Sequence, residues 1–153
     1  MNVLITGGTG LIGKKLVHKL RERNHNPRVL TRKKTDNPNE FYWNTEENFI
    51  DPKAFEHLDS IIHLAGANIS QKWTTDYKRE LFSSRIDTAN LLKDYCLRQI
   101  VRLKSFISAS GINYYGTFTS NQILKEEDGI SKHDFLAKLC HQWENAADNF
   151  SDV

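Results

Sequence analysis

Four glycines near the start of the chain have the spacing of a phosphate-binding turn. They lie within Thr6–Gly13 (TGGTGLIG), between an apolar run and a run of helical periodicity. Gly7 allows a tight turn out of a strand, Gly10 lets the backbone approach a pyrophosphate, and Gly13 lets the helix pack closely. The free N–H groups and the dipole at the helix start favour phosphates. We predict a dinucleotide-binding turn; the alternative is a glycine-rich turn without a ligand.

The residues after the second apolar run indicate which dinucleotide the turn would bind. An NAD site offers an Asp or Glu to the ribose hydroxyls about 20 residues beyond the glycines. Here Thr31 is followed by Arg32, Lys33 and Lys34, and no acid occurs before Asp36. Thr31 can hydrogen-bond a 2′-phosphate and Arg32 can pair with it. The sequence therefore predicts NADP(H), preferred over NAD(H); the alternative is a basic surface turn.

Apolar runs of strand length alternate with longer runs of helical periodicity along the chain. The predicted strands are residues 2–6, 28–31, 41–43, 60–64 and 105–108. The first predicted helix starts at Leu11 and ends at Asn24 and Pro27, and its apolar stripe consists of Leu11, Ile12, Leu16, Val17 and Leu20. A short helix is predicted after Asp51-Pro52, and a long one over 73–99 with Thr74, Thr75 or Asp76 as its cap. The last predicted helix covers 133–150. Tyr114, Tyr115 and residues 117–131 are predicted to lie in loops.

The order of these elements predicts the fold class. Strands that alternate with helices and are apolar on both faces indicate a parallel sheet covered by helices on both sides. The fold class is α/β, a Rossmann-type doubly wound parallel sheet. A further strand would normally follow the last helix, but the chain ends at Val153. We therefore interpret residues 1–153 as one NAD(P)-binding Rossmann domain, truncated before a substrate-binding C-terminal part.

Composition limits the other classes of function. Hydrophobic residues make up 39% and charged residues 26% of the chain, which suits a packed core. The net charge of +2 gives no argument for nucleic acid. Cys96 and Cys140 have no Cys/His cluster near them, so we expect neither a disulfide framework nor a metal site. No signal peptide or membrane span is visible, and we expect a reduced, cytoplasmic protein.

Taken together, the motifs resemble the extended short-chain dehydrogenases/reductases, and most closely their atypical subgroup of sugar-nucleotide epimerase-like proteins. The residues that carry the resemblance are Thr6–Gly13, Trp43, Ile62–Gly66, Ala65–Ile69, Trp73-Thr74, Ser84-Arg85, Ser108–Ser110, Tyr115-Gly116 and Asp134–Glu144. They occur in the order that is typical of the subgroup. The resemblance spans essentially the whole chain but only the N-terminal half of such a protein.

The resemblance implies a set of contacts with the cofactor. It puts Leu64 and Ala65 beside the adenosine ribose, and Ser108 and Ala109 beside the nicotinamide ribose. The full predicted set of cofactor-binding residues is Thr6, Gly7, Gly10, Leu11, Ile12, Gly13, Thr31, Arg32, Leu64, Ala65, Gly66, Glu80, Arg85, Ser108 and Ala109, with Glu80 and Arg85 approaching from the long helix. His63, alone in an apolar strand, is interpreted as a hydrogen-bonded core residue.

The catalytic pair of the superfamily is missing from the expected place. The resemblance implies a Tyr-x-x-x-Lys pair on the last helix, in which Tyr transfers the proton and Lys lowers the pKa of that Tyr. When the helix is aligned on Trp143-Glu144, Leu136 stands at the Tyr position and Cys140 at the Lys position. Neither side chain can do that work.

Three other residues are the candidates for catalysis. Ser110 matches the serine that orients the substrate, although one extra residue precedes Tyr115-Gly116. Tyr114 or Tyr115 could act from its loop as a substitute acid. The alternative is that both tyrosines only pack the loop.

Two functions of different class remain open on these residues. The first is an NADP(H)-binding oxidoreductase or epimerase-like protein that acts on an unknown small-molecule substrate. The second is a non-catalytic dinucleotide-binding sensor or scaffold protein. A further alternative is a fragment that holds only half of a cofactor site. Nucleic-acid and membrane partners are not expected. Extended members of the superfamily often form dimers through their long helices. The resemblance therefore implies a homodimer as one possible assembly of this chain.

Overall fold

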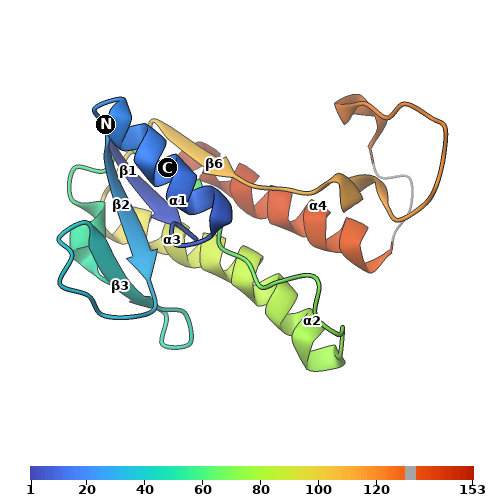
Figure 1. Ribbon diagram of the computed structural model, residues 1–153, viewed down its shortest axis with the longest axis horizontal. Coiled ribbons are helices and arrows are strands. Elements are labelled where there is room, and N and C mark those ends of the chain that lie inside the picture. The colour runs from blue at the N-terminus through green and yellow to red at the C-terminus, as the bar shows by residue number, and fades with distance from the viewer. Residues whose placement is uncertain (130–133) are drawn as a thin grey trace.

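The computed structural model describes residues 1–129 and 134–153, which form helices around a six-stranded sheet (Figure 1). The strands are β1 (Asn2–Thr6), β2 (Asn26–Thr31), β3 (Glu40–Asn44), β4 (Phe49–Ile50), β5 (Ser60–His63) and β6 (Ser105–Ser108). Their order is β4-β3-β2-β1-β5-β6. The pairs β1–β2, β2–β3, β1–β5 and β5–β6 are parallel, and β3–β4 is antiparallel. The predicted α/β class with a doubly wound parallel sheet is confirmed.

The sheet has a switch point at β1. From β1 the chain builds β2 and β3 on one side, and then crosses to build β5 and β6 on the other. In open sheets of this kind, ligands bind outside the carboxyl ends of the strands where the order reverses. The glycine turn and the ends of β5 and β6 all lie at this edge of the sheet, because each follows the carboxyl end of a parallel strand.

Helices cover both faces of the sheet. They are α1 (Leu11–Glu22), α2 (Thr75–Phe82), α3 (Thr88–Arg98) and α4 (Phe135–Asp148). α1 lies on one face, and α3 and α4 lie on the other (Figure 1). The single helix predicted over 73–99 is divided, because a π-helical turn over Ser83–Asp87 joins α2 to α3. Thr74 is the N-cap of α2, and its side chain accepts a hydrogen bond from the Tyr77 N–H at 3.2 Å.

Other boundaries differ by a few residues from those expected. β2 starts at Asn26, so Pro27 belongs to the strand and does not end the preceding helix. The two-residue strand β4 was not predicted. Short 3-10 turns occupy Pro52–Phe55, Ile112–Tyr115, Glu126–Asp128 and Asn149–Asp152. The expected helix start at 133 and the end of the expected loop at 130–131 lie outside the described residues.

The hydrophobic core lies between the sheet and the helices α3 and α4. Leu4 and Ile61 from the sheet and Leu92 from α3 are fully buried there. The rings of Phe106 on β6 and Phe150 after α4 stack with centroids 3.6 Å apart. This packing fixes β6 against the end of α4, and the predicted catalytic residues Ser110, Tyr114 and Tyr115 lie in the segment between these two elements.

The first helix faces the sheet with a narrower stripe than the one expected. Gly13 is buried, whereas Leu11 and Ile12 are 82% and 69% exposed. The inward positions of a helix recur every 3.6 residues, so Gly13, Leu16 and Leu20 face inward and the two residues before Gly13 are rotated away. Leu11 and Ile12 are therefore surface residues at the start of α1, a correction to their predicted place in the core stripe.

Three observations concern the cysteines, metal binding and membrane-spanning helices. Cys96 and Cys140 are free cysteines, and both are buried. Within residues 1–129 and 134–153, no three His, Cys, Asp or Glu side chains are grouped so that they could hold a metal ion. None of the helices in this part of the chain is both long and apolar enough to cross a membrane.

Candidate functional site

The glycine turn is packed so tightly that a Cβ at two of its positions would collide with backbone atoms. Gly7 has φ +70°, and a Cβ there would lie 2.9 Å from the carbonyl carbon of Leu64. A Cβ at Gly13 would lie 2.2 Å from the carbonyl oxygen of Gly7. The turn, the end of β5 and α1 are thus in direct backbone contact. Gly13 packs the helix against the turn itself, which is closer than the helix–sheet packing that was expected.

The other two glycines have different roles. At Gly8 a Cβ would lie 2.6 Å from a methyl carbon of Val29, so this glycine lets the turn rest on β2. The sequence analysis gave Gly8 no role, because its partner Val29 is distant in the chain. Among residues 1–129 and 134–153, the only atom within 4 Å of a Cβ at Gly10 is the Gly7 carbonyl oxygen at 3.2 Å. The protein itself therefore restricts Gly10 little, and the prediction that Gly10 makes room for a ligand stays open.

The start of α1 is free to bind an anion. Gly10 is its N-cap, with extended backbone and no side-chain cap, and the first turn contains no acidic residue. The first N–H groups of a helix without a cap bind water or a ligand. Leu11 and Ile12, the first two helical residues, supply such N–H groups while their side chains are exposed. This is the geometry that favours a phosphate at a helix N-terminus.

Thr6 connects the glycine turn to the end of β5. Its hydroxyl is buried and accepts hydrogen bonds from the N–H groups of Leu64 at 3.1 Å and Ala65 at 3.0 Å. It also lies 2.7 Å from Nδ1 of His63. All of the Thr6 hydroxyl is used inside the protein. In the structure Thr6 positions Leu64 and Ala65, and direct contact of its side chain with a cofactor stays a prediction.

His63 is a hydrogen-bonded core residue, as interpreted from the sequence. Its Nε2 lies 3.0 Å from the carbonyl oxygen of Arg85, which can only accept, so Nε2 carries the proton. Nδ1 then accepts from the Thr6 hydroxyl. Burial lowers the pKa of His63 to about 4, so the ring is neutral at neutral pH. It joins β1, β5 and the π-helical turn and has no exposed surface for chemistry.

Arg85 is turned inward from the π-helical turn. Its guanidinium donates to the carbonyl oxygens of Ala67 at 2.9 Å and Leu81 at 3.1 Å, and lies 5.0 Å from the ring centroid of Trp143. A Cβ at Gly66 would lie 2.8 Å from its Cζ. Burial lowers the pKa of Arg85. Arg85 thus fastens the loop after β5 to α4, and its predicted contact with a cofactor stays untested.

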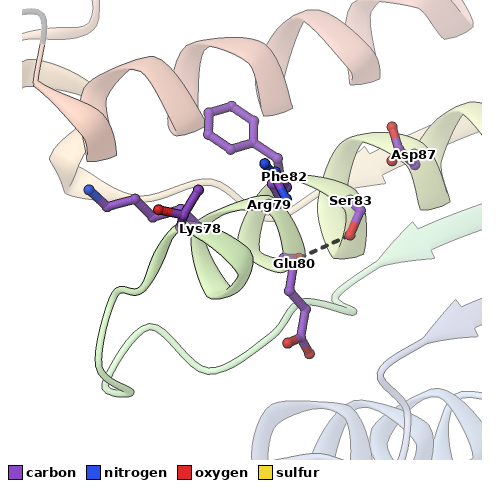
Figure 2. A pocket seen from close by; sticks show the side chains of 7 residues that line it. Lys78, Arg79, Glu80, Phe82, Ser83 and Asp87 are labelled. Carbon is purple, nitrogen blue, oxygen red and sulfur yellow. Dashed lines mark hydrogen bonds between the residues drawn. The ribbon is translucent and has the colours of Figure 1, made fainter.

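Glu80 lies on α2, before the π-helical turn that carries Arg85. It lines a shallow cavity of about 680 Å³ together with Lys78, Phe82 and Asp87 among others. Figure 2 shows Glu80 and Phe82 pointing to opposite sides of α2. The cavity is lined by α2 and the turn after it, without any residue of the glycine turn. Its lining therefore gives no support to a cofactor contact by Glu80, which stays a prediction.

The end of β2 presents a basic cluster. Thr31 is buried, and its hydroxyl is hydrogen-bonded to the carbonyl oxygen of Lys33. Arg32 is exposed and forms no ion pair among the described residues. The ammonium of Lys34 lies 5.5 Å from the ring centroid of Tyr42. Arg32 and the neighbouring exposed Lys33 remain available to a phosphate, whereas the Thr31 hydroxyl already has a partner.

The residues after β6 are fastened to both β5 and α4. Ala109 donates its N–H to the carbonyl oxygen of His63 at 3.1 Å, and the Ser108 hydroxyl donates to the Ala109 carbonyl oxygen at 3.0 Å. The Ser110 hydroxyl donates to a carboxylate oxygen of Glu144 on α4. Ser108 thus ends β6, and Ala109 and Ser110 lie just beyond its carboxyl end. The partner Glu144 was not predicted, because 34 residues separate it from Ser110.

The two positions at which the resemblance implies a catalytic pair, 136 and 140, lie on α4. Cys140 is 5% exposed, and burial raises the pKa of its thiol. Its sulfur accepts a hydrogen bond from the backbone N–H of Gly111. Leu136 stands one turn earlier on the same helix. A neutral thiol and an aliphatic chain supply neither a proton donor of the Tyr type nor the cation that would activate one.

The two tyrosines of the expected loop lie in the 3-10 turn beside α4. Their rings meet edge to face with centroids 5.5 Å apart, and Tyr114 lies 6.3 Å from the ring of His141. Desolvation raises the pKa of Tyr115, and the charges of Glu126, Asp128 and Glu144 raise it further. Tyr115 therefore remains a phenol at neutral pH. In the superfamily a cation has the opposite effect on the catalytic Tyr.

Comparison with models of protein families gives a match over most of the chain. Residues 3–135 match the NAD dependent epimerase/dehydratase family. The chain belongs to this family. The match includes the glycine turn, the basic cluster after β2 and the residues after β6, and it ends at the start of α4. The resemblance inferred from the motifs is thereby confirmed at the level of the family.

Named relatives and solved structures agree with this family. The chain is 34% identical over 145 residues to an epimerase family protein of Mycobacterium leprae, which covers 94% of this chain and 46% of the relative. It is 32% identical over 148 residues to the epimerase family protein YfhF of Bacillus subtilis, with 94% and 48% covered. This chain thus spans about half the length of these relatives.

Two solved structures have similar folds. The human epimerase family protein SDR39U1, solved with NADPH, has a TM-score of 0.79 at 28% identity, covering 96% of this chain and 48% of that one. A nucleoside-diphosphate sugar epimerase of Corynebacterium glutamicum has a TM-score of 0.79 at 31% identity, covering 99% of this chain and 31% of that one. Both confirm the Rossmann-type fold.

Proposed function

We propose that this chain binds NADP(H), in preference to NAD(H), at the carboxyl edge of its sheet. The observation that carries the proposal is the uncapped start of α1, held by backbone contact against the end of β5. The basic cluster after β2 lies at the same edge and supports the choice of NADP(H). The NADPH in the solved human relative is further support.

The residues at this edge suit the parts of such a cofactor. The N–H groups that open α1 would bind the pyrophosphate, and Arg32 would pair with the 2′-phosphate. Leu64 and Ala65, held by Thr6, would flank the adenosine ribose. The cofactor would supply a hydride donor or acceptor at the other end. That end would lie beyond β5 and β6, beside Ala109 and Ser110.

The function that follows is an NADP(H)-dependent oxidoreductase or epimerase-like activity on a small molecule. Ser110 would orient an oxygen of that molecule with its hydroxyl. The substrate is undefined, because the relatives are about twice as long as this chain. We also propose that the protein is cytoplasmic and has neither a nucleic-acid nor a membrane partner. We propose a homodimer as its assembly, which analytical sedimentation would test.

A second candidate function is a dinucleotide-binding sensor or scaffold without turnover. The observation in its favour is the apolar environment of the usual catalytic positions, in which Cys140 is buried and has a raised pKa. Both candidates need the cofactor, so binding does not distinguish them. Hydride transfer to a carbonyl compound does.

Parallel titrations with NADPH and NADH, followed by nicotinamide fluorescence, test the proposal. We expect tight binding that favours NADPH. Arg32→Ala should weaken NADPH binding by about 10- to 150-fold, which corresponds to a charge-assisted contact of about 1.5–3 kcal/mol, and should leave NADH binding unchanged. Arg102→Ala is the matched control, because Arg102 is an exposed arginine before β6, at the opposite edge of the sheet. Binding of neither cofactor, or no change in preference, would contradict the proposal.

A further inference from the structure

Ser110 and Glu144 form a hydrogen-bonded pair at the place where the catalytic pair of the superfamily is missing. We propose that Glu144, acting through the Ser110 hydroxyl, is the proton acceptor of the reaction site. The inference rests on the proposed function, because it needs a nicotinamide cofactor at the ends of β5 and β6. It names a residue that neither the motifs nor the family resemblance assigned to chemistry.

The position of the pair in the fold is the first argument. Ser110 is the second residue after β6, and β6 is the outermost strand past the switch point. A dinucleotide that starts at the glycine turn extends across the carboxyl ends of the strands on that side. The backbone bond from Ala109 to His63 fixes the residue before Ser110 at the end of β5. The reactive end of the cofactor would therefore come to rest beside Ser110.

The arrangement of side chains along α4 is the second argument. Leu136, Cys140 and Glu144 are spaced by four residues, so they lie in one row on the helix. The segment after β6 contacts this row at two successive turns, where the Gly111 N–H meets Cys140 and the Ser110 hydroxyl meets Glu144. Glu144 is the first member of the row that can accept a proton. It is also half-buried, which strengthens its interactions with neighbouring groups.

The charged and titratable groups around Glu144 leave it as the acceptor. From the 3-10 turn, Tyr115 has a raised pKa and stays protonated. On α4 itself, Cys140 also has a raised pKa and stays a thiol. Arg85, on the π-helical turn, can only donate and is bound to backbone oxygens. Ser110 is the group that joins this carboxylate to the space beyond β6.

The proton transfer can be written for the oxidation of an alcohol. The hydroxyl proton of the alcohol passes to Oγ of Ser110, as Ser110 passes its own proton to the carboxylate of Glu144. The carbon–hydrogen bond of the alcohol breaks and a carbonyl forms, with the hydride accepted by the oxidised nicotinamide. The products are a carbonyl compound, a reduced cofactor and a protonated Glu144, which returns its proton to water. Reduction is the same sequence in reverse.

Cofactor binding in the absence of substrate tests whether the negative charge of Glu144 lies near the nicotinamide ring. The oxidised nicotinamide is a cation and the reduced ring is neutral, so a nearby carboxylate favours NADP+ alone. Glu144→Gln keeps an acceptor for Ser110 and removes the charge. We expect it to weaken NADP+ binding by about fivefold or more and to leave NADPH binding unchanged. Glu144→Asp should restore the wild-type ratio, and Asp148→Asn, an exposed acid one turn further along α4, should have no effect.

The outcomes of this titration are distinct. An unchanged ratio of the NADP+ and NADPH dissociation constants in Glu144→Gln would overturn the inference while leaving the proposed function intact. An equal loss for both cofactors, not restored by Glu144→Asp, would also overturn it, because only a structural role would then remain. Failure of the wild-type protein to bind either cofactor would overturn the proposed function, and this inference with it.

Hydride transfer tests the proton itself. With NADPH and phenanthrenequinone as a small carbonyl probe, Glu144→Gln should lower kcat by about 100-fold at unchanged melting temperature. Ser110→Ala should have a similar effect, and Ser110→Thr should retain most of the rate because it keeps the hydroxyl. The pH dependence of the wild-type rate should disappear in Glu144→Gln. A rate in Glu144→Gln equal to that of the wild type, or no turnover by the wild type, would overturn the inference.

Discussion

The glycine turn and the junction of β6 with α4 lie at the same edge of the sheet, yet they are built differently. The turn is held by backbone packing, because a Cβ at Gly7 or Gly13 would collide with backbone atoms. The junction is held by side chains, chiefly the bond between Ser110 and Glu144 and the stacked rings of Phe106 and Phe150. Backbone packing tolerates almost no substitution. Side-chain packing lets the chemistry change while the fold stays, and the proposed role of Ser110 and Glu144 is a change of this kind.

The largest expected effect is at the turn, from Gly13→Ala. The added Cβ would lie 2.2 Å from the Gly7 carbonyl oxygen, and backbone cannot move aside cheaply. We expect a loss of about 3 kcal/mol or more in the free energy of unfolding, measured by urea denaturation. Gly10→Ala is the matched control, since its Cβ would meet one atom at 3.2 Å. Gly10→Ala should cost about 1 kcal/mol in stability but should abolish most NADPH binding. Equal stability of the two variants would show that backbone packing does not distinguish these positions.

The second prediction concerns His63, which joins the two regions. Burial lowers its pKa to about 4 in the folded protein, from 6.5 for an ordinary histidine. Between these values the unfolded chain binds more protons, so the free energy of unfolding falls as the pH drops from 6.5 towards 4. The loss attributable to His63 is roughly 3 kcal/mol at most. Urea denaturation between pH 7 and 4 measures it.

Two variants isolate this contribution. His63→Gln should remove most of the pH dependence in this range, at some cost in stability at pH 7. His141→Gln is the control, because His141 is exposed on α4. It should leave the pH dependence unchanged. A wild-type protein whose stability is flat from pH 6.5 to 4 would contradict the buried neutral histidine.

The third prediction asks whether Arg85 belongs to the cofactor site or to the scaffold. Its guanidinium donates to two carbonyl oxygens and lies over Trp143, and lysine cannot reproduce that planar arrangement. Arg85→Lys should lower the free energy of unfolding by about 2 kcal/mol. NADPH affinity of the folded variant should change by less than about threefold. A large loss of affinity at unchanged stability would instead assign Arg85 to the cofactor, as the family resemblance implied.

The same contrast explains what could be predicted from the sequence. The strands, the glycine turn and the core role of His63 follow from local patterns, because backbone conformation and burial restrict the residue types at neighbouring positions of the sequence. The π-helical turn over Ser83–Asp87 does not, since its apolar spacing differs little from that of an α-helix. The pairing of Ser110 with Glu144 does not either, because it joins elements 34 residues apart. The side-chain chemistry of the junction becomes visible only in the fold.

The smallest expected effect is at the tyrosines of the 3-10 turn. It tests whether these tyrosines or the pair of Ser110 and Glu144 transfer the proton. If the proton passes through Ser110 and Glu144, Tyr115 takes no part in the transfer. The carboxylate of Glu144 then only helps to raise the pKa of Tyr115. Tyr115→Phe and Tyr114→Phe should each lower the rate of phenanthrenequinone reduction by less than about threefold, far less than Glu144→Gln. Glu144→Gln should also lower the pKa of Tyr115, because it removes one of the negative charges near the phenol; ultraviolet titration of the phenol measures this shift. A loss of rate in Tyr115→Phe as large as that in Glu144→Gln would return the role of the acid to the tyrosine, and would mean that the junction keeps the chemistry of the superfamily with a different route for the proton.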